Sequence, residues 1–589
     1  MPSSSKQWWK VSRQLLNRKT KASTIPSLKN GAGTWINNPV EKANLLAQTF
    51  QSKCVLPPEP DSVEEYTAHN IRMPEFCLIR RRWALKIIKQ LKDGKASGPD
   101  GLPVRFYKEC ANSLSIVVTL LTRYLLRHRR WPDAWRKHRI HPLHKKQAVS
   151  NPAHYRGVHL TDIISKLVER CVAHVVTPYF DRVGAFGIDQ WAFRKKRSCR
   201  DLVTLLICKW LWAMDQGFKV AIYLSDISGA FDKVDRQRMV KRLREIGLSE
   251  SMVEFLIDYL APRSAVVVVQ GHESMVFVIS DQIFQGTVLG PPLWNVFFEP
   301  IDSAVLSQKF KVAKFADDLT AYRYFKRSTP NDVILDDLKA CQVATHNWGV
   351  QTRVSFDTSK EYFCILDRQD PFGDVFKLLG VLIDPKLSMA QEVQRIRKKA
   401  SPKIKAILAN RHFFDVKGLM HQYKAHALSQ LEFSAGAIYH AADTHLDVLD
   451  KLQHGFLREI GLTIEQAFLD HNLAPLRLRR DIAVMGLLHK IQLGEAHADF
   501  SLLFQQDVYE RAAFTRHNAR RHRRQFRETW GNTDYYNRSI FSAVRVYNVL
   551  SADIVEAKCV KSFQTLLTKQ ARIACEANQP GWDRMFCAH

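Results

Sequence analysis

Three aspartates in this chain of 589 residues stand at the ends of hydrophobic runs that are typical of β-strands. Asp226 follows AIYLS, and the adjacent pair Asp317 and Asp318 follows KVAKFA. A carboxylate at a strand end projects from rigid backbone, which suits the fixed geometry of a metal site. Two Mg²⁺ ions on such carboxylates would activate an attacking hydroxyl and hold the oxygens of a leaving pyrophosphate. The alternative is that the adjacent pair simply begins a turn, because aspartate favours turns.

The charge balance of the chain indicates a polyanionic partner. Lys and Arg number 87 against 58 Asp and Glu, so the formal net charge is +29 at pH 7. Nucleic acid is the simplest polyanion that such a chain would bind. The 11 cysteines form no CxxC pair, and no apolar run approaches membrane-spanning length. We therefore expect an intracellular protein of the nucleus and/or cytoplasm, without a membrane partner.

The hydrophobic patterns predict helices first, then a β-rich middle, then helices again. Helical patterns cover 39–50, 80–95, 104–127, 165–180 and 237–247, and they dominate from about residue 385 onward. The segment 137–160 is compatible with a basic hairpin, and the runs 264–271 and 274–280 predict a second hairpin around a glycine. Further β-like runs cover 220–227 and 311–318. This order predicts an α+β fold with several subdomains.

Several motifs, taken in chain order, resemble those of reverse transcriptases. LSDISGAFDKVDRQRMVKRLREIG, QIFQGTVLGPPLWNVFF and KFADDLTAY resemble the palm motifs of that family. KASGPDGLP and QWAFRKKRSCRDL upstream resemble finger segments, and FKLLGVLIDPKLSM downstream resembles the start of the thumb. The similarity covers about residues 75–570 and is more narrowly with the polymerases of non-LTR retrotransposons of the jockey and CR1 type. An ordered set of motifs makes the turn-only interpretation of the aspartate pair weak.

The resemblance implies a right-hand polymerase with fingers, palm and thumb, an antiparallel palm sheet and a mostly helical C-terminal region. The expected domains are a connector or N-terminal extension at 1–75, fingers at 76–205, palm at 206–375, thumb at 376–440 and a helical basic region at 441–589. Elements of this type carry an endonuclease before the polymerase. We expect no such domain in the few residues upstream, so the nick would come from elsewhere.

The activity that the resemblance implies is that of an RNA-directed DNA polymerase, a nucleotidyltransferase. It would copy RNA into DNA from a primer 3′-hydroxyl during retrotransposition, with two Mg²⁺ ions, or Mn²⁺ in their place. Its partners would be an RNA template, a DNA primer or target, and dNTP. Two alternatives stay open. One is a catalytically decayed nucleic-acid-binding remnant of a retroelement. The other is an RNA-dependent RNA polymerase, although the aromatic side chain of Phe231 is an argument against it.

The family roles carry over residue by residue. The carboxylates that would bind metal are Asp226, Asp317 and Asp318. Residues that would contact or line the nucleotide are Lys145 or Lys146, Arg156, Phe231, Gln285, Gly286 and Lys360. Among these, Phe231 would exclude a ribose 2′-hydroxyl, Arg156 would hold the triphosphate, and Lys360 would protonate the pyrophosphate.

A basic segment at 511–530 supplies the remaining candidates. It contains seven arginines and one acidic residue, which favours contacts with a nucleic-acid backbone. The candidates are Arg520, Arg521, Arg523 and Arg524. The alternative is an ordinary solvated basic face.

Overall fold

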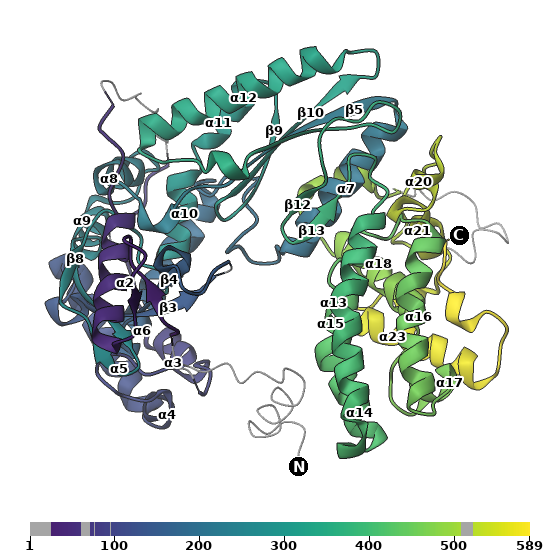
Figure 1. The fold of residues 1–589 in the computed structure, drawn as a ribbon, viewed down its shortest axis with the longest axis horizontal. Helices are drawn as coiled ribbons and strands as arrows, with labels where there is room; N and C mark the ends of the chain where they lie inside the picture. Colours follow the sequence, from purple (N-terminus) through teal and green to yellow (C-terminus); the bar gives the residue numbers. More distant parts are fainter. Residues whose placement is uncertain are drawn as a thin grey trace.

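A four-stranded sheet lies between the N-terminal and the C-terminal elements of the chain (Figure 1). The computed structural model describes residues 25–60, 71–75, 77–94, 96–145, 147–507 and 522–588. The strand order is β11-β5-β10-β9, and every neighbouring pair is antiparallel. The strands are β5 (Phe218–Ser225), β9 (Lys311–Phe315), β10 (Asp318–Lys326) and β11 (Tyr362–Leu366).

Strand β5 is almost wholly buried because both faces of this sheet are covered. Its alternating side chains Val220 and Ile222 join one hydrophobic cluster with helix α7 (Cys199–Asp215). Ala221 and Tyr223 point the other way and join a second cluster with α12 (Asn331–Thr352). Burial on both faces explains why VAIYL is a continuous apolar run without polar alternation.

A second sheet, of order β4-β3-β6-β7 with β8 also on β6, lies among the N-terminal elements. Its strands are β3 (Lys137–His144), β4 (Tyr155–Leu160), β6 (Arg263–Val269), β7 (His272–Glu273) and β8 (Phe277–Ile279). The pairs β3–β4 and β6–β8 are antiparallel, so both predicted hairpins are confirmed, while β3 and β6 pair in parallel.

Helices of the N-terminal part surround these two sheets. They are α2 (Pro39–Lys53), α3 (Arg81–Lys89), α4 (Val104–Glu109), α5 (Ala111–His128), α6 (Ile163–Arg182), α8 (Arg236–Glu245), α9 (Glu250–Tyr259), α10 (Gly290–Phe298) and α11 (Ile301–Ser307). The helices predicted from periodicity in this part are confirmed, and the mixture of helix and sheet confirms the α+β class.

The C-terminal part begins with the short pair β12 (Phe376–Leu378) and β13 (Val381–Ile383) and is then mainly helical. Its helices are α13 (Ala390–Ala409), α14 (Val416–Gln422), α15 (Ser429–Leu431), α16 (Asp443–Glu459), α17 (Ile464–Leu469), α18 (Leu476–Gln492), α19 (Ala498–Leu503), α20 (Asp534–Asn537), α21 (Ile540–Asn548), α22 (Ala552–Val555) and α23 (Val560–Glu576). Within the described part of the chain, no helix has the length and apolarity needed to cross a membrane.

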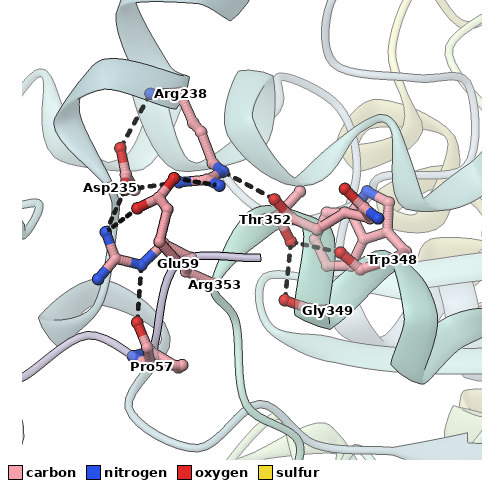
Figure 2. A network of polar contacts seen from close by, with 9 residues as sticks. Pro57, Glu59, Asp235, Arg238, Trp348, Gly349, Thr352 and Arg353 are labelled. Carbon is pink, nitrogen blue, oxygen red and sulfur yellow. Dashed lines mark hydrogen bonds and ion pairs between the residues drawn. The ribbon is translucent and has the colours of Figure 1, made fainter. Parts of the chain in front are cut away.

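The segment that follows α2 is tied to the ends of two distant helices by a polar network (Figure 2). The Glu59 carboxylate pairs with Arg238 of α8 and with Arg353, which follows α12, at 2.8 Å in each case. The Arg353 Nε atom also donates to the carbonyl of Pro57 at 2.7 Å. Asp235 joins both arginines from the N-terminal end of α8. This network fixes the chain just beyond α2 on the body that carries the four-stranded sheet.

Candidate active site

The three predicted carboxylates emerge at one end of the four-stranded sheet. Strands β9 and β10 are joined by the two-residue turn Ala316 and Asp317, and Asp318 is the first residue of β10. Leu319 of β10 pairs with Ser225 of β5, so Asp226 leaves β5 beside Asp318. Asp226 and Asp317 both line one cavity of about 790 Å³, a volume within the range of ligand sites.

Burial and neighbouring carboxylate charges raise the proton affinity of Asp317 and Asp318. Burial raises the pKa of Asp317, and the charge of Asp226 adds to the effect. Loss of hydration and the charges of Asp317 and Asp226 raise the pKa of Asp318 to about 7. Clustered acidic oxygens with raised proton affinity are suited to a hard divalent cation, which would compensate their charge.

The fit to Mg²⁺ depends on ligands from outside the protein. Among the described residues, no group of three or more His, Cys, Asp or Glu side chains converges closely enough to hold a metal ion. Mg²⁺ commonly takes one or two carboxylates and completes its octahedron with waters and substrate phosphates. Asp226, Asp317 and Asp318 fit that mode, with substrate oxygens supplying the remaining ligands.

Lys360 approaches Asp226 in the structure. Its Nζ atom donates to Asp226 Oδ2 at 2.7 Å and pairs with Asp357 Oδ2 at 2.6 Å. Burial lowers the pKa of Lys360, but the bonds to these two carboxylates outweigh burial and raise it overall. Lys360 is therefore a protonated donor at the edge of the cavity, and its role as a general acid stays a prediction.

We expect Asp318→Asn to remove a pH dependence of stability in protein free of divalent metal. A carboxyl whose folded-state pKa is raised binds more protons folded than unfolded between about pH 4 and pH 7, so its contribution to stability falls as pH rises there. The gain in Tm of Asp318→Asn over the parent should therefore grow from pH 4.5 to pH 7.5 in differential scanning calorimetry with EDTA. A gain that is constant or shrinks over that range would contradict the raised pKa of Asp318.

The turn that carries Asp317 is held by a buried amide. Ala316 has φ of +60°, a left-handed conformation that strains a residue with a Cβ atom. Fully buried Gln190 accepts a hydrogen bond from Ala316 N at 3.0 Å and donates to Ala316 O at 3.2 Å. Trp294 Nε1 of α10 donates to the same carbonyl at 3.1 Å. These hydrogen bonds satisfy both the backbone N–H and the backbone carbonyl of Ala316 and so stabilise its strained conformation.

Further cationic side chains line the same cavity. Lys145 follows β3 and Arg156 lies on β4, so the β3–β4 hairpin places both on the cavity wall. Burial lowers the pKa of Lys145, with a further contribution from the charge of Arg156. Lys146 lies outside the described residues.

The wall of the cavity also contains Gln285 and Gly286. Gln285 Nε2 donates to Asp232 Oδ1 at 2.8 Å, which orients the amide along the cavity wall. Gly286 has φ of +105°, and a Cβ atom there would lie 2.8 Å from the carbonyl oxygen of His159. Glycine is therefore required for the backbone to pass this close to β4.

Phe231 lies on the cavity wall, in the turn η3 (Ala230–Asp232) that follows β5. Its ring stacks on Trp294 with centroids 5.5 Å apart, and Phe193 meets it edge-on at 6.4 Å. The ring is thereby held rigidly beside Asp226 and Asp317. A bulky group in this position can restrict which sugar enters the cavity.

The structure adds two residues to the site that the sequence patterns did not single out. Gln190 stands within QWAF, a motif quoted above, but its bonds to Ala316 span 126 residues. Lys53 is the last residue of α2 and lines the cavity from a region predicted only as a connector. No local pattern marks either contact, since each depends on segments that meet only in the folded chain.

The basic C-terminal candidates are separated by the structure. Arg523 is exposed, whereas Arg524 donates through Nη1 to the carbonyl of Val555 at 2.9 Å. Arg524 thus forms hydrogen bonds within the protein. For the exposed Arg523, contact with nucleic acid remains a prediction. Arg520 and Arg521 lie outside the described residues.

Comparisons with known proteins agree with this geometry. Residues 143–381 match the family model described as "Reverse transcriptase (RNA-dependent DNA polymerase)". These residues are thus similar to a reverse transcriptase domain. The match confirms the resemblance seen in the motifs, and the domain implies a right-hand polymerase fold.

Curated proteins similar to this chain come from mobile elements of flies. The chain is 23% identical over 482 residues to "RNA-directed DNA polymerase from mobile element jockey" of Drosophila melanogaster, covering 77% of this chain and 52% of the relative. The Drosophila funebris protein of the same name is 24% identical over 485 residues, with the same coverages. "Probable RNA-directed DNA polymerase from transposon X-element" of Drosophila melanogaster is 23% identical, again over 77% of this chain and 52% of the relative. The chain thus spans about half the length of these relatives.

Proposed function

We propose that this chain is an RNA-directed DNA polymerase that extends a primer 3′-hydroxyl on an RNA template during retrotransposition. One observation carries the proposal: Asp226 and Asp317 line a cavity whose other walls hold Lys145, Arg156 and Phe231. Carboxylates for metal, cations for phosphate and a ring beside them are the parts that two-metal nucleotidyl transfer requires. The family match and the names of the relatives support the same activity.

We assign the four-stranded sheet to the palm, at 206–375, and the β3–β4 hairpin to the fingers, at 76–205. Strands β6 and β8 belong to the palm range in sequence, yet they complete the finger sheet by pairing. Residues 376–440 are assigned to the thumb and 441–589 to the helical basic region, with 1–75 as the N-terminal extension. Nucleus and/or cytoplasm is the proposed place of action.

The residues at the cavity would have different roles in the reaction. Two Mg²⁺ ions, or Mn²⁺, when bound would activate the primer hydroxyl and neutralise charge on the leaving pyrophosphate. Asp226, Asp317 and Asp318 would hold them. Arg156 and Lys145 orient the triphosphate, with Gln285 and Gly286 along its path. Lys360 Nζ, which lines the cavity, would donate a proton to the departing pyrophosphate oxygen as a general acid.

Primer extension on poly(rA)/oligo(dT) tests the proposal directly. We expect incorporation of dTTP that depends on Mg²⁺ or Mn²⁺ and that proceeds by single nucleotides from the primer terminus. Incorporation of UTP in preference to dTTP would favour an RNA-dependent RNA polymerase. Binding of the primer–template without any incorporation under either metal would favour a catalytically decayed remnant.

Phe231→Ala should relax the choice of sugar. Removing the ring opens space beside Asp226, so a ribose 2′-hydroxyl no longer meets it, and the ratio of kcat/KM for UTP to that for dTTP should rise about 10–100-fold. Single-nucleotide extension with each substrate measures the ratio. Phe413→Ala, an exposed aromatic outside the cavity, is the control and should leave the ratio unchanged. An unaltered ratio in Phe231→Ala would contradict the gate role.

A further inference from the structure

Helix α2 of the N-terminal region forms part of the wall of the active-site cavity. Its apolar residues, among them Leu46 and Phe50, pack in one cluster with Ile140 of β3 and Tyr155 of β4. In Figure 1 this purple helix lies against the β3 and β4 strands. Phe50, Lys53 and Cys54 line the cavity together with Asp226 and Asp317. The region upstream of the matched domain is therefore structurally part of the site.

Lys53 is held with its ammonium group at the cavity. Its Nζ atom donates to the carbonyls of Ala153 and Tyr155, both at 2.9 Å, immediately before Arg156. An ammonium has three donors, so one remains after these two bonds. Both acceptors are neutral, and Lys53 forms no ion pair with any residue that the structure describes. Its positive charge is therefore balanced only at longer range, by the charge of Asp232.

The charges around Lys53 indicate what the third donor would meet. Burial lowers the pKa of Lys53, and the positive charges of Lys145 and Arg156 lower it further. The negative charge of Asp232 acts in the opposite direction and raises it. Lys53, Lys145 and Arg156 repel one another across the cavity. Asp232, which also accepts a hydrogen bond from Gln285, offsets part of their charge, and Asp226 and Asp317 also act on Lys145. A polyanion between them would relieve the repulsion.

The polar network beyond α2 holds Lys53 in place from the other side. Figure 2 shows Pro57 and Glu59 joined to Arg353 and Arg238. The chain is thus fixed before Lys53 by the packing of α2 and a few residues after it by this network. Because the backbone on both sides of Lys53 is held, its side chain is preorganised. Little conformational entropy is then lost when the side chain binds a ligand.

We propose that Lys53 is a third cationic ligand of the triphosphate of the incoming nucleotide, beside Lys145 and Arg156. The inference rests on the proposed polymerase function and extends it, because it makes the N-terminal region a contributor to nucleotide binding. Lys53 also bonds to the backbone next to Arg156, so it positions that arginine while contacting phosphate. The template backbone carries the same phosphate chemistry, but a single phosphodiester charge matches the three cations less well than a triphosphate does.

Lys53→Met is the principal test. We expect KM for dTTP to rise about tenfold, the loss typical of one hydrogen bond to a charged group, with a much smaller change in kcat. Lys53→Arg keeps the charge and should recover most of the affinity. Lys42→Met is the matched control: Lys42 lies on the same helix and donates to the carbonyl of Ile25 at 3.0 Å, away from the cavity. It should lower Tm without changing KM.

Direct binding separates this inference from the proposed function. Isothermal titration calorimetry with inorganic tripolyphosphate should give about tenfold weaker binding for Lys53→Met than for the parent, even in a protein without polymerase activity. The affinity for single-stranded RNA should stay within about twofold, which distinguishes a triphosphate ligand from a template ligand. Equal tripolyphosphate affinity in parent and Lys53→Met, or no tripolyphosphate binding by the parent, would overturn the inference. So would a loss confined to RNA binding.

Discussion

Asp317→Asn is expected to abolish primer extension, with kcat lowered about 10³-fold or more. Asn keeps the shape of the side chain and its place in the turn after β9, but it removes the charge that would hold metal at the transition state, a contribution of several kcal/mol. The same change should raise Tm in the absence of divalent metal. Burial and the charge of Asp226 disfavour ionised Asp317, so its replacement by a neutral amide relieves repulsion at neutral pH.

Loss of activity together with gain of stability is the signature that distinguishes a functional carboxylate from a structural one. Calorimetry with and without Mg²⁺ adds a second readout, because Mg²⁺ should raise the Tm of the parent and not that of Asp317→Asn. Asp336→Asn is the control, since Asp336 forms an exposed pair with Lys339 on α12 and should change neither activity nor Tm appreciably. Extension that survives Asp317→Asn would remove Asp317 from the metal site.

The central part of the site could be predicted because its residues lie in local patterns. VAIYL is apolar throughout since β5 is buried on both faces, and the end of this strand places Asp226. KVAKF is also β-like, and a two-residue turn between β9 and β10 brings Asp317 and Asp318 to the same edge of the sheet. Strand ends and tight turns are determined by neighbouring residues, so the sequence carries enough information to predict them.

The remainder of the site depends on contacts between distant segments. Lys53 bonds to Tyr155 across 102 residues, and no periodicity in α2 distinguishes Lys53 from Lys42, the other lysine of the helix. The basic run near residue 520 illustrates the same limit, because composition cannot separate exposed Arg523 from Arg524, whose guanidinium bonds to backbone carbonyls. Charge patterns predict that a surface is basic, but the fold determines which cationic side chains are exposed to a ligand and which bond within the protein.

Gln190→Leu should lower both activity and stability through the turn at Ala316. Leucine removes the acceptor for the N–H groups of Ala316 and Ala192, both at 3.0 Å, and leaves two donors unpaired in the interior. The free energy of unfolding should fall by about 2–5 kcal/mol, since each buried unpaired donor costs about 1–3 kcal/mol. The turn then relaxes from its positive φ and shifts Asp317, and a displacement of about 1 Å can lower kcat about 10²-fold.

The decisive comparison is between kcat and stability in variants that are equally destabilised. Gln453→Leu is the matched control, because Gln453 is also a buried glutamine that donates to a backbone carbonyl, Ala474 at 3.0 Å, but far from the cavity. It should lower Tm while leaving kcat per folded molecule unchanged. Ala316→Gly in the Gln190→Leu background should restore part of kcat, because glycine adopts positive φ without strain. If Gln190→Leu and Gln453→Leu share the same kcat per folded molecule, then Gln190 stabilises the fold without positioning Asp317.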